Sequence, residues 1–179
     1  MDKSICINLY SGPGAGKSTT AAKLFSEMKC RGMDVELVTE YAKDLVWSDR
    51  HYEFGDQFYI LAKQYHRLWK LNKKVKYIVT DSPLILNYAY QVPTVHIREI
   101  IKGMYEEFDN LNYFINRTKK YNPKGRMQSE GEAKLIDTKI FDVLKQLNID
   151  FKGITSHQTE EILKDLDVIE HSINSVEIG

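Results

Sequence analysis

The stretch that decides the fold of this chain is Ser11-Gly12-Pro13-Gly14-Ala15-Gly16-Lys17-Ser18-Thr19. Just before it, apolar residues alternate with smaller or polar ones over 5–9, which predicts a short buried strand. Just after it, apolar residues recur at helical spacing over 21–28, which predicts a helix with one buried face. A glycine-rich turn between a strand and a helix, ending in Lys-Ser, is the context of a phosphate-binding loop.

The residue types in this loop explain how it would hold a phosphate group. Backbone N–H groups and the partial positive charge of the helix N-terminus attract phosphate oxygens. Lys17 can reach the β- and γ-phosphates of a nucleotide, and the Ser18 hydroxyl can ligate Mg²⁺. We therefore expect ATP and Mg²⁺ as cofactors. The expected nucleotide-binding residues are Gly12, Pro13, Gly14, Ala15, Gly16, Lys17, Ser18 and Thr19.

One position departs from the usual motif, which has a glycine where this chain has Ser11. Gly12 supplies backbone freedom one position later, and the residues from Gly14 to Ser18 keep the register of the motif. The alternative interpretation is an ordinary glycine-rich turn that binds nothing. The adjoining strand, the lysine and the serine together favour phosphate binding.

The composition is that of an ordinary globular protein without net charge. The chain has 179 residues, of which 42% are hydrophobic and 28% charged, and this length predicts one domain over 1–179. Zero net charge argues weakly against a protein whose main task is to grip a polyanion. Cys6 and Cys30 have no metal-ligand spacing, and we recognise neither a signal peptide nor a membrane-spanning run. We therefore expect a cytoplasmic location.

Strands and helices are expected to alternate after the loop. The predicted strands cover 35–38, 77–79, 112–115 and 151–155, and the predicted helices cover 54–71, 94–108, 130–147 and 159–166. Ser129 and Glu132 have the spacing of a capping box for the helix over 130–147. Alternation implies parallel strands joined by right-handed crossovers. The prediction is a three-layer α/β/α sandwich with a five-stranded parallel sheet, the P-loop NTPase fold, whose ligand lies at the carboxyl ends of the strands.

Two acidic residues are placed at expected strand ends. Glu40 closes the second strand, where a carboxylate could accept a proton from an attacking hydroxyl or hold a metal-bound water. Asp81 ends the third strand, which is the place of an acid that holds Mg²⁺. The structural alternatives are an acid at a helix N-terminus for Glu40 and a turn-forming aspartate for Asp81. The phosphate loop favours the functional interpretation of both.

A basic segment follows the fourth predicted strand. Residues 117–126 contain five basic residues and no acid, and Pro123 and Gly125 indicate a loop. We interpret the region over 117–128 as a lid, with Arg117 and Arg126 neutralising charge on a transferring phosphoryl group. The alternatives are a solvated surface loop and a contact with a nucleic-acid backbone.

The long helix over 54–71 offers candidate contacts for an acceptor. Gln57 and Gln64 lie near one face of that helix, and a glutamine amide can pair with donors and acceptors on a base edge. Tyr41 offers a surface on which a base could stack. The alternative for these side chains is structural, because most aromatic residues near a helix belong to the core.

The chain resembles P-loop kinases of nucleosides or nucleotides, the group that holds thymidylate kinases, deoxynucleoside kinases and ribosylnicotinamide-kinase-like proteins. The resemblance covers most of the chain and is specific at the phosphate loop. It implies that Glu40 is the general base and that Gln57 reads the acceptor's base. It also implies a lid containing the basic residues Arg117, Lys119, Lys120 and Arg126.

One feature of thymidylate kinases is missing. These enzymes have an arginine directly after the strand-end aspartate, followed later by Ala-Tyr-Gln. Here Ala89-Tyr90-Gln91 follows Asp81 at a similar spacing, but Ser82 stands in the place of the arginine. Since that arginine clamps an acceptor phosphate, its absence favours an alcohol acceptor over a phosphate acceptor.

Together these observations predict a kinase that transfers the γ-phosphate of ATP to a nucleoside- or nucleotide-like small molecule. The expected catalytic residues are Lys17, Glu40, Asp81, Arg117 and Arg126, with Ser18 and Asp81 on the metal and Glu40, Tyr41, Gln57 and Gln64 on the acceptor. Related bacteriophage kinases phosphorylate a hydroxymethylated base within DNA, so DNA stays open as a substrate and the host cytoplasm as a location. An ATP-hydrolysing switch is a further alternative.

We expect no membrane partner. The helix expected near 92–108 could form a homodimer, although such an amphipathic helix more often packs on its own sheet.

Overall fold

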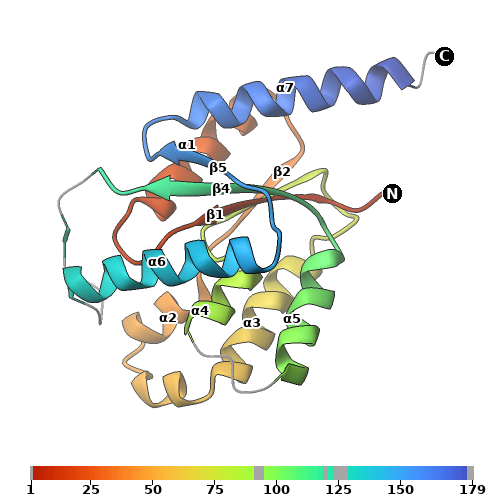
Figure 1. Cartoon of the computed structure of the whole chain (residues 1–179). Coiled ribbons are helices and arrows are strands. Elements are labelled where there is room, and N and C mark those ends of the chain that lie inside the picture. Colours follow the sequence, from red (N-terminus) through yellow and green to blue (C-terminus); the bar gives the residue numbers. More distant parts are fainter. Residues whose placement is uncertain (1, 91–94, 119–120, 123–128, 177–179) are drawn as a thin grey trace.

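A parallel β-sheet forms the centre of the molecule (Figure 1). The computed structural model describes residues 2–90, 95–118, 121–122 and 129–176, and within them five strands lie in the order β2-β3-β1-β4-β5. The strands are β1 (Ile5–Tyr10), β2 (Val35–Val38), β3 (Tyr77–Thr80), β4 (Asp109–Asn116) and β5 (Lys152–Thr155). All their pairings are parallel, which confirms the sheet predicted from the sequence.

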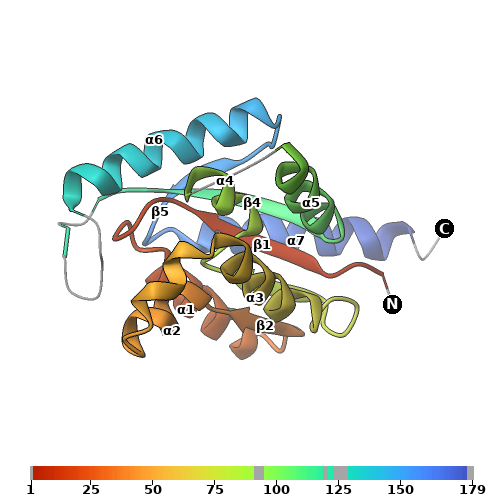
Figure 2. The ribbon, with the colours of Figure 1, turned by 90° about the horizontal axis from the view of Figure 1, so that it is seen from below.

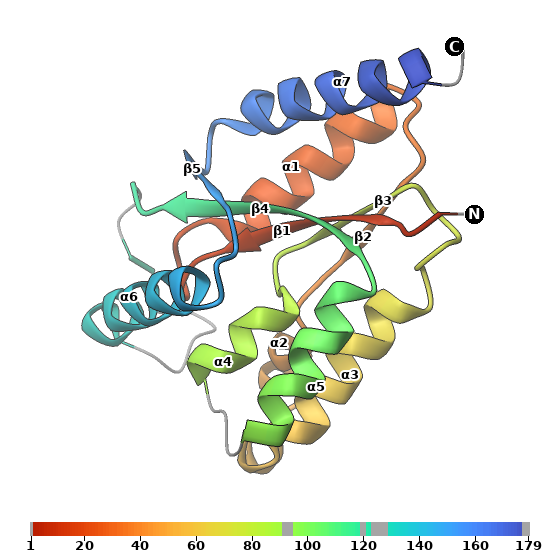
Figure 3. The same cartoon turned by 45° about the vertical axis from the view of Figure 1, so that its right-hand side comes forward.

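Two helices, α1 (Lys17–Cys30) and α7 (Thr159–Val176), cover one face of the sheet and lie side by side (Figure 3). Ile7 and Leu9 of β1 point to this face and pack in one core with buried residues such as Leu24 of α1 and Leu166 of α7. Alternate residues of a strand point to opposite faces, so Cys6 and Tyr10 of β1 belong to the second core.

Helices α3 (Gln57–Trp69), α5 (Val95–Glu106) and α6 (Glu130–Gln146) cover the opposite face (Figure 2). Their buried residues, among them Leu61, Ile101 and Ile140, pack against that face of the sheet. The connections also contain α2 (Tyr41–Trp47), α4 (Asn87–Tyr90) and the 3-10 turns η1 (His51–Gly55) and η2 (Leu84–Leu86). The predicted three-layer sandwich is therefore confirmed. None of the helices in the described ranges is long and apolar enough to span a bilayer.

The helices differ from the predictions in several places. The helix expected from residue 54 begins at Gln57, because Asp56 caps it by accepting a hydrogen bond from the Tyr59 amide at 2.9 Å. The short helices α2 and α4 were not predicted at all. The last helix continues to Val176 instead of ending near 166. The expected start at 94 lies outside the described residues, and α5 is described from residue 95.

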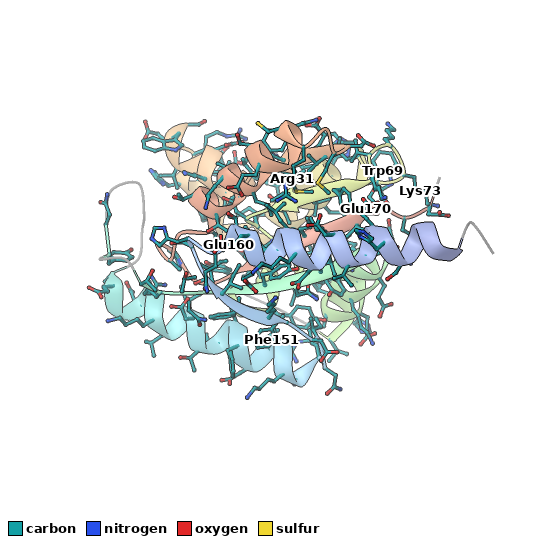
Figure 4. All side chains as sticks on the ribbon, turned by 90° about the horizontal axis from the view of Figure 1, so that it is seen from above. Arg31, Trp69, Lys73, Phe151, Glu160 and Glu170 are labelled. Carbon is teal, nitrogen blue, oxygen red and sulfur yellow. The ribbon has the colours of Figure 1, made fainter. Side chains whose placement is uncertain are left out.

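Polar contacts explain why α7 extends beyond its apolar segment. The Glu170 carboxylate accepts hydrogen bonds from Lys76 Nζ, at 2.5 Å, and from the Tyr77 hydroxyl at the start of β3. Three residues earlier, Asp167 pairs with Arg31 at the end of α1, with 3.4 Å between nitrogen and oxygen. Figure 4 labels Arg31 and Glu170 where α7 lies beside α1. These pairs connect the second half of α7 to the end of α1 and to the start of β3.

The predicted capping box at the start of α6 is confirmed. The Ser129 hydroxyl accepts from the Glu132 amide at 3.3 Å, and the Glu132 carboxylate accepts from the Ser129 amide at 2.7 Å. The Ser129 hydroxyl also donates to the Glu132 carboxylate at 2.8 Å, and the hydrogen bonds from the Ser129 amide and hydroxyl lower the pKa of Glu132. The cap sets where α6 begins, and so where its residues meet the glycine-rich loop.

Replacing Ser129 with alanine should lower the free energy of unfolding by about 1 kcal/mol, because the Glu132 amide at the start of α6 loses the hydroxyl that accepts its hydrogen bond. Urea denaturation followed by circular dichroism measures this change. Ser26→Ala is the control, since Ser26 is exposed within α1 and alanine is the better helix former there. An equal loss of stability in both variants would contradict a specific role for the capping box.

Candidate active site

The register of the sheet gathers the ends of the strands at one edge. Asn8 of β1 and Val38 of β2 are both aligned with Thr80 of β3, and Tyr10 is aligned with Phe114 of β4. Because all strands are parallel, the segments that follow them leave at the same edge. This places the glycine-rich loop in the same region as Glu40, Asp81, Arg117 and the turn after β5.

The glycine-rich loop joins β1 to α1 through a conformation that favours glycine. Gly16 is the N-cap of α1 and has φ 112°. A Cβ on Gly16 would lie 2.7 Å from Cβ of Ser156, in the turn after β5. The first turn of α1 contains no acidic residue, so no carboxylate of that turn offsets its partial positive charge. The loop therefore has the features of an anion-binding helix start.

Lys17 is the cation at the centre of this region. Its Nζ donates to the backbone carbonyls of Ser11, at 2.6 Å, and Gly12, at 3.1 Å. Burial lowers the pKa of Lys17, while the nearby carboxylates of Glu40, Asp81 and Asp137 act to raise that pKa and Arg117 acts to lower it. The structure thus brings Lys17 together with three of the other predicted catalytic residues.

Asp81 is placed at the end of β3 as a buried carboxylate. It is 3% exposed, and its Oδ1 atom has no hydrogen-bond partner among the described residues. An oxygen in this state suits a metal ion or a metal-bound water. Ser18, the other predicted metal ligand, is exposed at the start of α1. The described ranges contain no group of three or more His, Cys, Asp or Glu residues that could hold a metal by themselves.

Glu40 occupies the N-cap position of α2, so it is an acid at a helix N-terminus, as the structural alternative predicted. Its side chain, however, makes no capping hydrogen bond. The carboxylate acts instead on groups of the site. It acts to raise the pKa of Lys17, and after burial it is the largest contribution to the raised pKa of Tyr90 in α4. Glu40, which follows β2, therefore lies close enough to Lys17 and Tyr90 to act on both electrostatically.

The described part of the predicted lid lies on the glycine-rich loop. Nη1 of Arg117 donates to the carbonyl of Pro13 at 2.8 Å. The ring of Tyr121 is close enough to Gly14 that a Cβ there would lie 2.9 Å from it. The other predicted lid residues Lys119, Lys120 and Arg126, like Gln91, lie outside the described residues.

Asp137 of α6 belongs to the site but was missed from the sequence. One of its oxygens accepts from the Ser11 hydroxyl at 2.8 Å and from the Gly12 amide at 2.5 Å, and the other pairs with Arg117. A signal was present, because Asp137 lies at helical spacing within the buried stripe of Ala133, Ile140 and Leu144. An acid on an apolar helix face needs a polar partner.

The predicted acceptor residues make contacts within the protein. The carboxamide oxygen of Gln64 accepts from the Tyr41 amide at 2.9 Å, while its buried nitrogen has no hydrogen-bond partner within the described ranges. The Gln57 nitrogen donates to the carbonyl of Phe54 at 2.7 Å. The Tyr41 hydroxyl donates to the hydroxyl of Tyr59 at 3.0 Å. Gln64 thus helps to fix the peptide that links Glu40 to Tyr41.

Comparison with known proteins gives a likeness of fold. No protein-family model matches the chain, and no curated protein sequence matches it significantly. The structure of NadR in complex with NAD and AMP-PNP aligns with 90% of this chain at 13% identity and a TM-score of 0.65. Thymidylate kinase from Ehrlichia chaffeensis aligns with 91% at 15% identity and 0.64, and NadR in complex with NR aligns with 85% at 15% identity and 0.59.

The alignments differ in how much of the other protein they cover. This chain spans 49% and 43% of the two NadR chains, but 98% of the thymidylate kinase chain. At these identities the likeness concerns the fold alone. The resemblance to nucleoside and nucleotide kinases noted in the sequence is confirmed at that level.

Gly16→Ala should lower the free energy of unfolding by about 1–3 kcal/mol, because alanine is strained at positive φ and its Cβ would meet Ser156. Gly131→Ala is the matched control, since a Cβ there meets open space within α6. Alanine at 131 should raise stability by about 0.5–1 kcal/mol. Chemical denaturation measures both, and equal effects of the two changes would contradict the described loop geometry.

Proposed function

We propose that this protein is an ATP- and Mg²⁺-dependent phosphotransferase that acts on a hydroxyl of a nucleoside- or nucleotide-like small molecule. The observation that carries the proposal is the arrangement around Lys17, which combines a glycine-rich loop with the carboxylates of Glu40 and Asp81 and the guanidinium of Arg117. Phosphoryl transfer needs positioning and neutralisation of charge more than covalent chemistry, and these groups supply both.

The donor nucleotide is assigned to the loop and the start of α1. Loop amides and Lys17 bind its phosphates, and this requires Lys17 to exchange its hydrogen bonds with the Ser11 and Gly12 carbonyls for phosphate oxygens. Arg117 approaches the same loop from the end of β4 and would neutralise charge on the transferring group. The likeness to NadR, which has been seen in complex with AMP-PNP, supports this assignment.

The metal is assigned to Ser18 and Asp81. Oδ1 of Asp81, which has no hydrogen-bond partner among the described residues, fits a hard cation. In such sites the cation is held by one or two protein oxygens together with phosphates and waters. When bound, Mg²⁺ would offset negative charge on the phosphates. The protein's part is to place the buried Asp81 carboxylate at the end of β3.

The acceptor is assigned to the side of the site formed by β2, α2 and α3. Glu40 would accept the proton of the attacking hydroxyl, and Gln57, Gln64 and Tyr41 would border the acceptor. Ser82 follows Asp81 where an arginine would clamp an acceptor phosphate, which favours an alcohol. The likeness to NadR in complex with NR and to a thymidylate kinase supports a nucleoside- or nucleotide-like acceptor.

Lys17→Met should reduce transfer of the γ-phosphate from ATP by about 100-fold or more, because the transition-state charge loses a preorganised cation. The assay follows labelled phosphate from ATP to nucleosides and nucleoside monophosphates, with circular dichroism to verify folding. Lys139→Met, at an exposed position of α6, is the control and should keep the activity of the unchanged protein. Full activity of folded Lys17→Met would refute the assignment of the loop.

Glu40→Gln should lower kcat by about 100-fold or more, since general bases contribute factors of this size. The affinity for ATP should change by less than about threefold, because the loop and not Glu40 binds the donor. Steady-state kinetics and calorimetric titration with ATP measure the two quantities. Glu99→Gln, on the exposed side of α5, serves as the control. Weaker ATP binding with unchanged kcat would remove Glu40 as the base.

A second candidate is a kinase of a hydroxymethylated base within DNA, which the basic lid segment favours. The same labelled assay on oligonucleotides with and without hydroxymethyl bases separates the two. Transfer to DNA that weakens steeply with salt would identify this second function. Label released only as free phosphate would instead indicate an ATP-hydrolysing switch.

A further inference from the structure

We propose that Asp137 is a positioning residue that joins the start of the glycine-rich loop and the arginine Arg117 into one rigid unit. The inference rests on the proposed function, since it assigns to Asp137 the task of holding Arg117 ready for the phosphates. It also explains the serine at position 11.

The Asp137 carboxylate is shared between two segments that are far apart in sequence. Its Oδ1 accepts from the Ser11 hydroxyl, at 2.8 Å, and from the Gly12 amide, at 2.5 Å. Its Oδ2 accepts from Nε of Arg117 at 2.8 Å and lies 2.8 Å from Nη2 of the same residue. The loop before α1 and the end of β4 therefore meet on one side chain of α6.

These contacts occupy most of the hydrogen-bond acceptor positions of the Asp137 carboxylate. A carboxylate offers about four acceptor positions, and donors from Ser11, Gly12 and Arg117 occupy a comparable number here. Asp137 is therefore poorly suited to accept a proton from a substrate or to ligate a metal. The role that remains for Asp137 is to hold Ser11, Gly12 and Arg117 in place.

The pairing also sets the direction of the arginine. Asp137 takes the Nε and Nη2 edge of the guanidinium, which leaves Nη1 against the loop, where it donates to the Pro13 carbonyl. The side chains of Arg117 and Asp137 are only 12% and 20% exposed, so water screens the pair little. An arginine fixed on two sides loses less rotamer freedom when it meets a phosphate.

The unusual Ser11 is part of the same unit. Ser11 is completely buried, and the glycine found at this place in the usual motif could not donate to Asp137. Gly12 is required by the close approach of α6, because a Cβ on Gly12 would lie 2.5 Å from the carbonyl oxygen of Ala133 and 2.9 Å from Oδ1 of Asp137. The Ser-Gly pair is thus shaped to receive the aspartate.

The test is a double-mutant cycle between Asp137→Asn and Arg117→Ala, read as kcat and KM for ATP. Asp137→Asn keeps the shape of the side chain but removes the charge, and should lower kcat by about tenfold. In the Arg117→Ala background, the same change should lower kcat by less than about twofold, because Asp137 no longer has an arginine to position. Asp142→Asn, at an exposed position of α6, is the control and should leave kcat unchanged.

Independent losses that multiply in the double variant would overturn the proposal, since a merely structural aspartate destabilises the protein with or without Arg117. If Asp137→Asn does not fold, Ser11→Ala takes its place in the cycle, with an expected loss of about threefold. If the unchanged protein transfers phosphate to no acceptor, the proposed function fails, and calorimetric ATP affinity becomes the readout. The proposal would then be supported if the double variant loses less binding free energy for ATP than the sum of the losses in the two single variants. Unchanged ATP affinity in Asp137→Asn would overturn it.

Discussion

The parallel pairing of the strands is the constraint on which the site depends. Since every strand runs in the same direction, the loops that leave their carboxyl ends must share one edge of the sheet. Two apolar cores, one on each face, hold the strands in that register and leave the edge for polar groups. Glu40, Asp81 and Arg117 are far from Lys17 in sequence but act on it electrostatically because of this topology.

Much of this organisation could be predicted from the sequence. The alternation of strands and helices, together with the glycine-rich loop, predicted the layers and the edge where the polar residues meet. The capping box at Ser129 was predictable because it depends on residues three positions apart. Glu40 and Asp81 could be assigned to strand ends because the end of an apolar run in the sequence marks the end of a buried strand.

The parts that could not be predicted depend on side chains that meet across the fold. Asp137 comes from a helix whose rotation against the loop is set by packing, so its contacts with Ser11 and Arg117 are not written in local spacing. The acceptor role predicted for Gln64 stays a prediction, but the hydrogen bond between its oxygen and the Tyr41 amide could not be foreseen, because the short helix α2 that begins at Tyr41 was not predicted. Local patterns locate elements, while tertiary contacts decide which polar atoms remain for a ligand.

The most direct test of a phosphate site at this edge is a heteronuclear NMR titration of the protein with ATP and Mg²⁺. A phosphate site here should give saturable changes in backbone amide shifts that are largest from Gly14 to Ser18 and extend to Arg117. A cavity of about 360 Å³ beside the beginnings of β4 and β5, lined by Tyr105, Asn112 and Asn148 among others, provides a comparison within the same spectrum. Changes confined to the residues of that cavity, or no changes at all, would contradict a phosphate site at the glycine-rich loop.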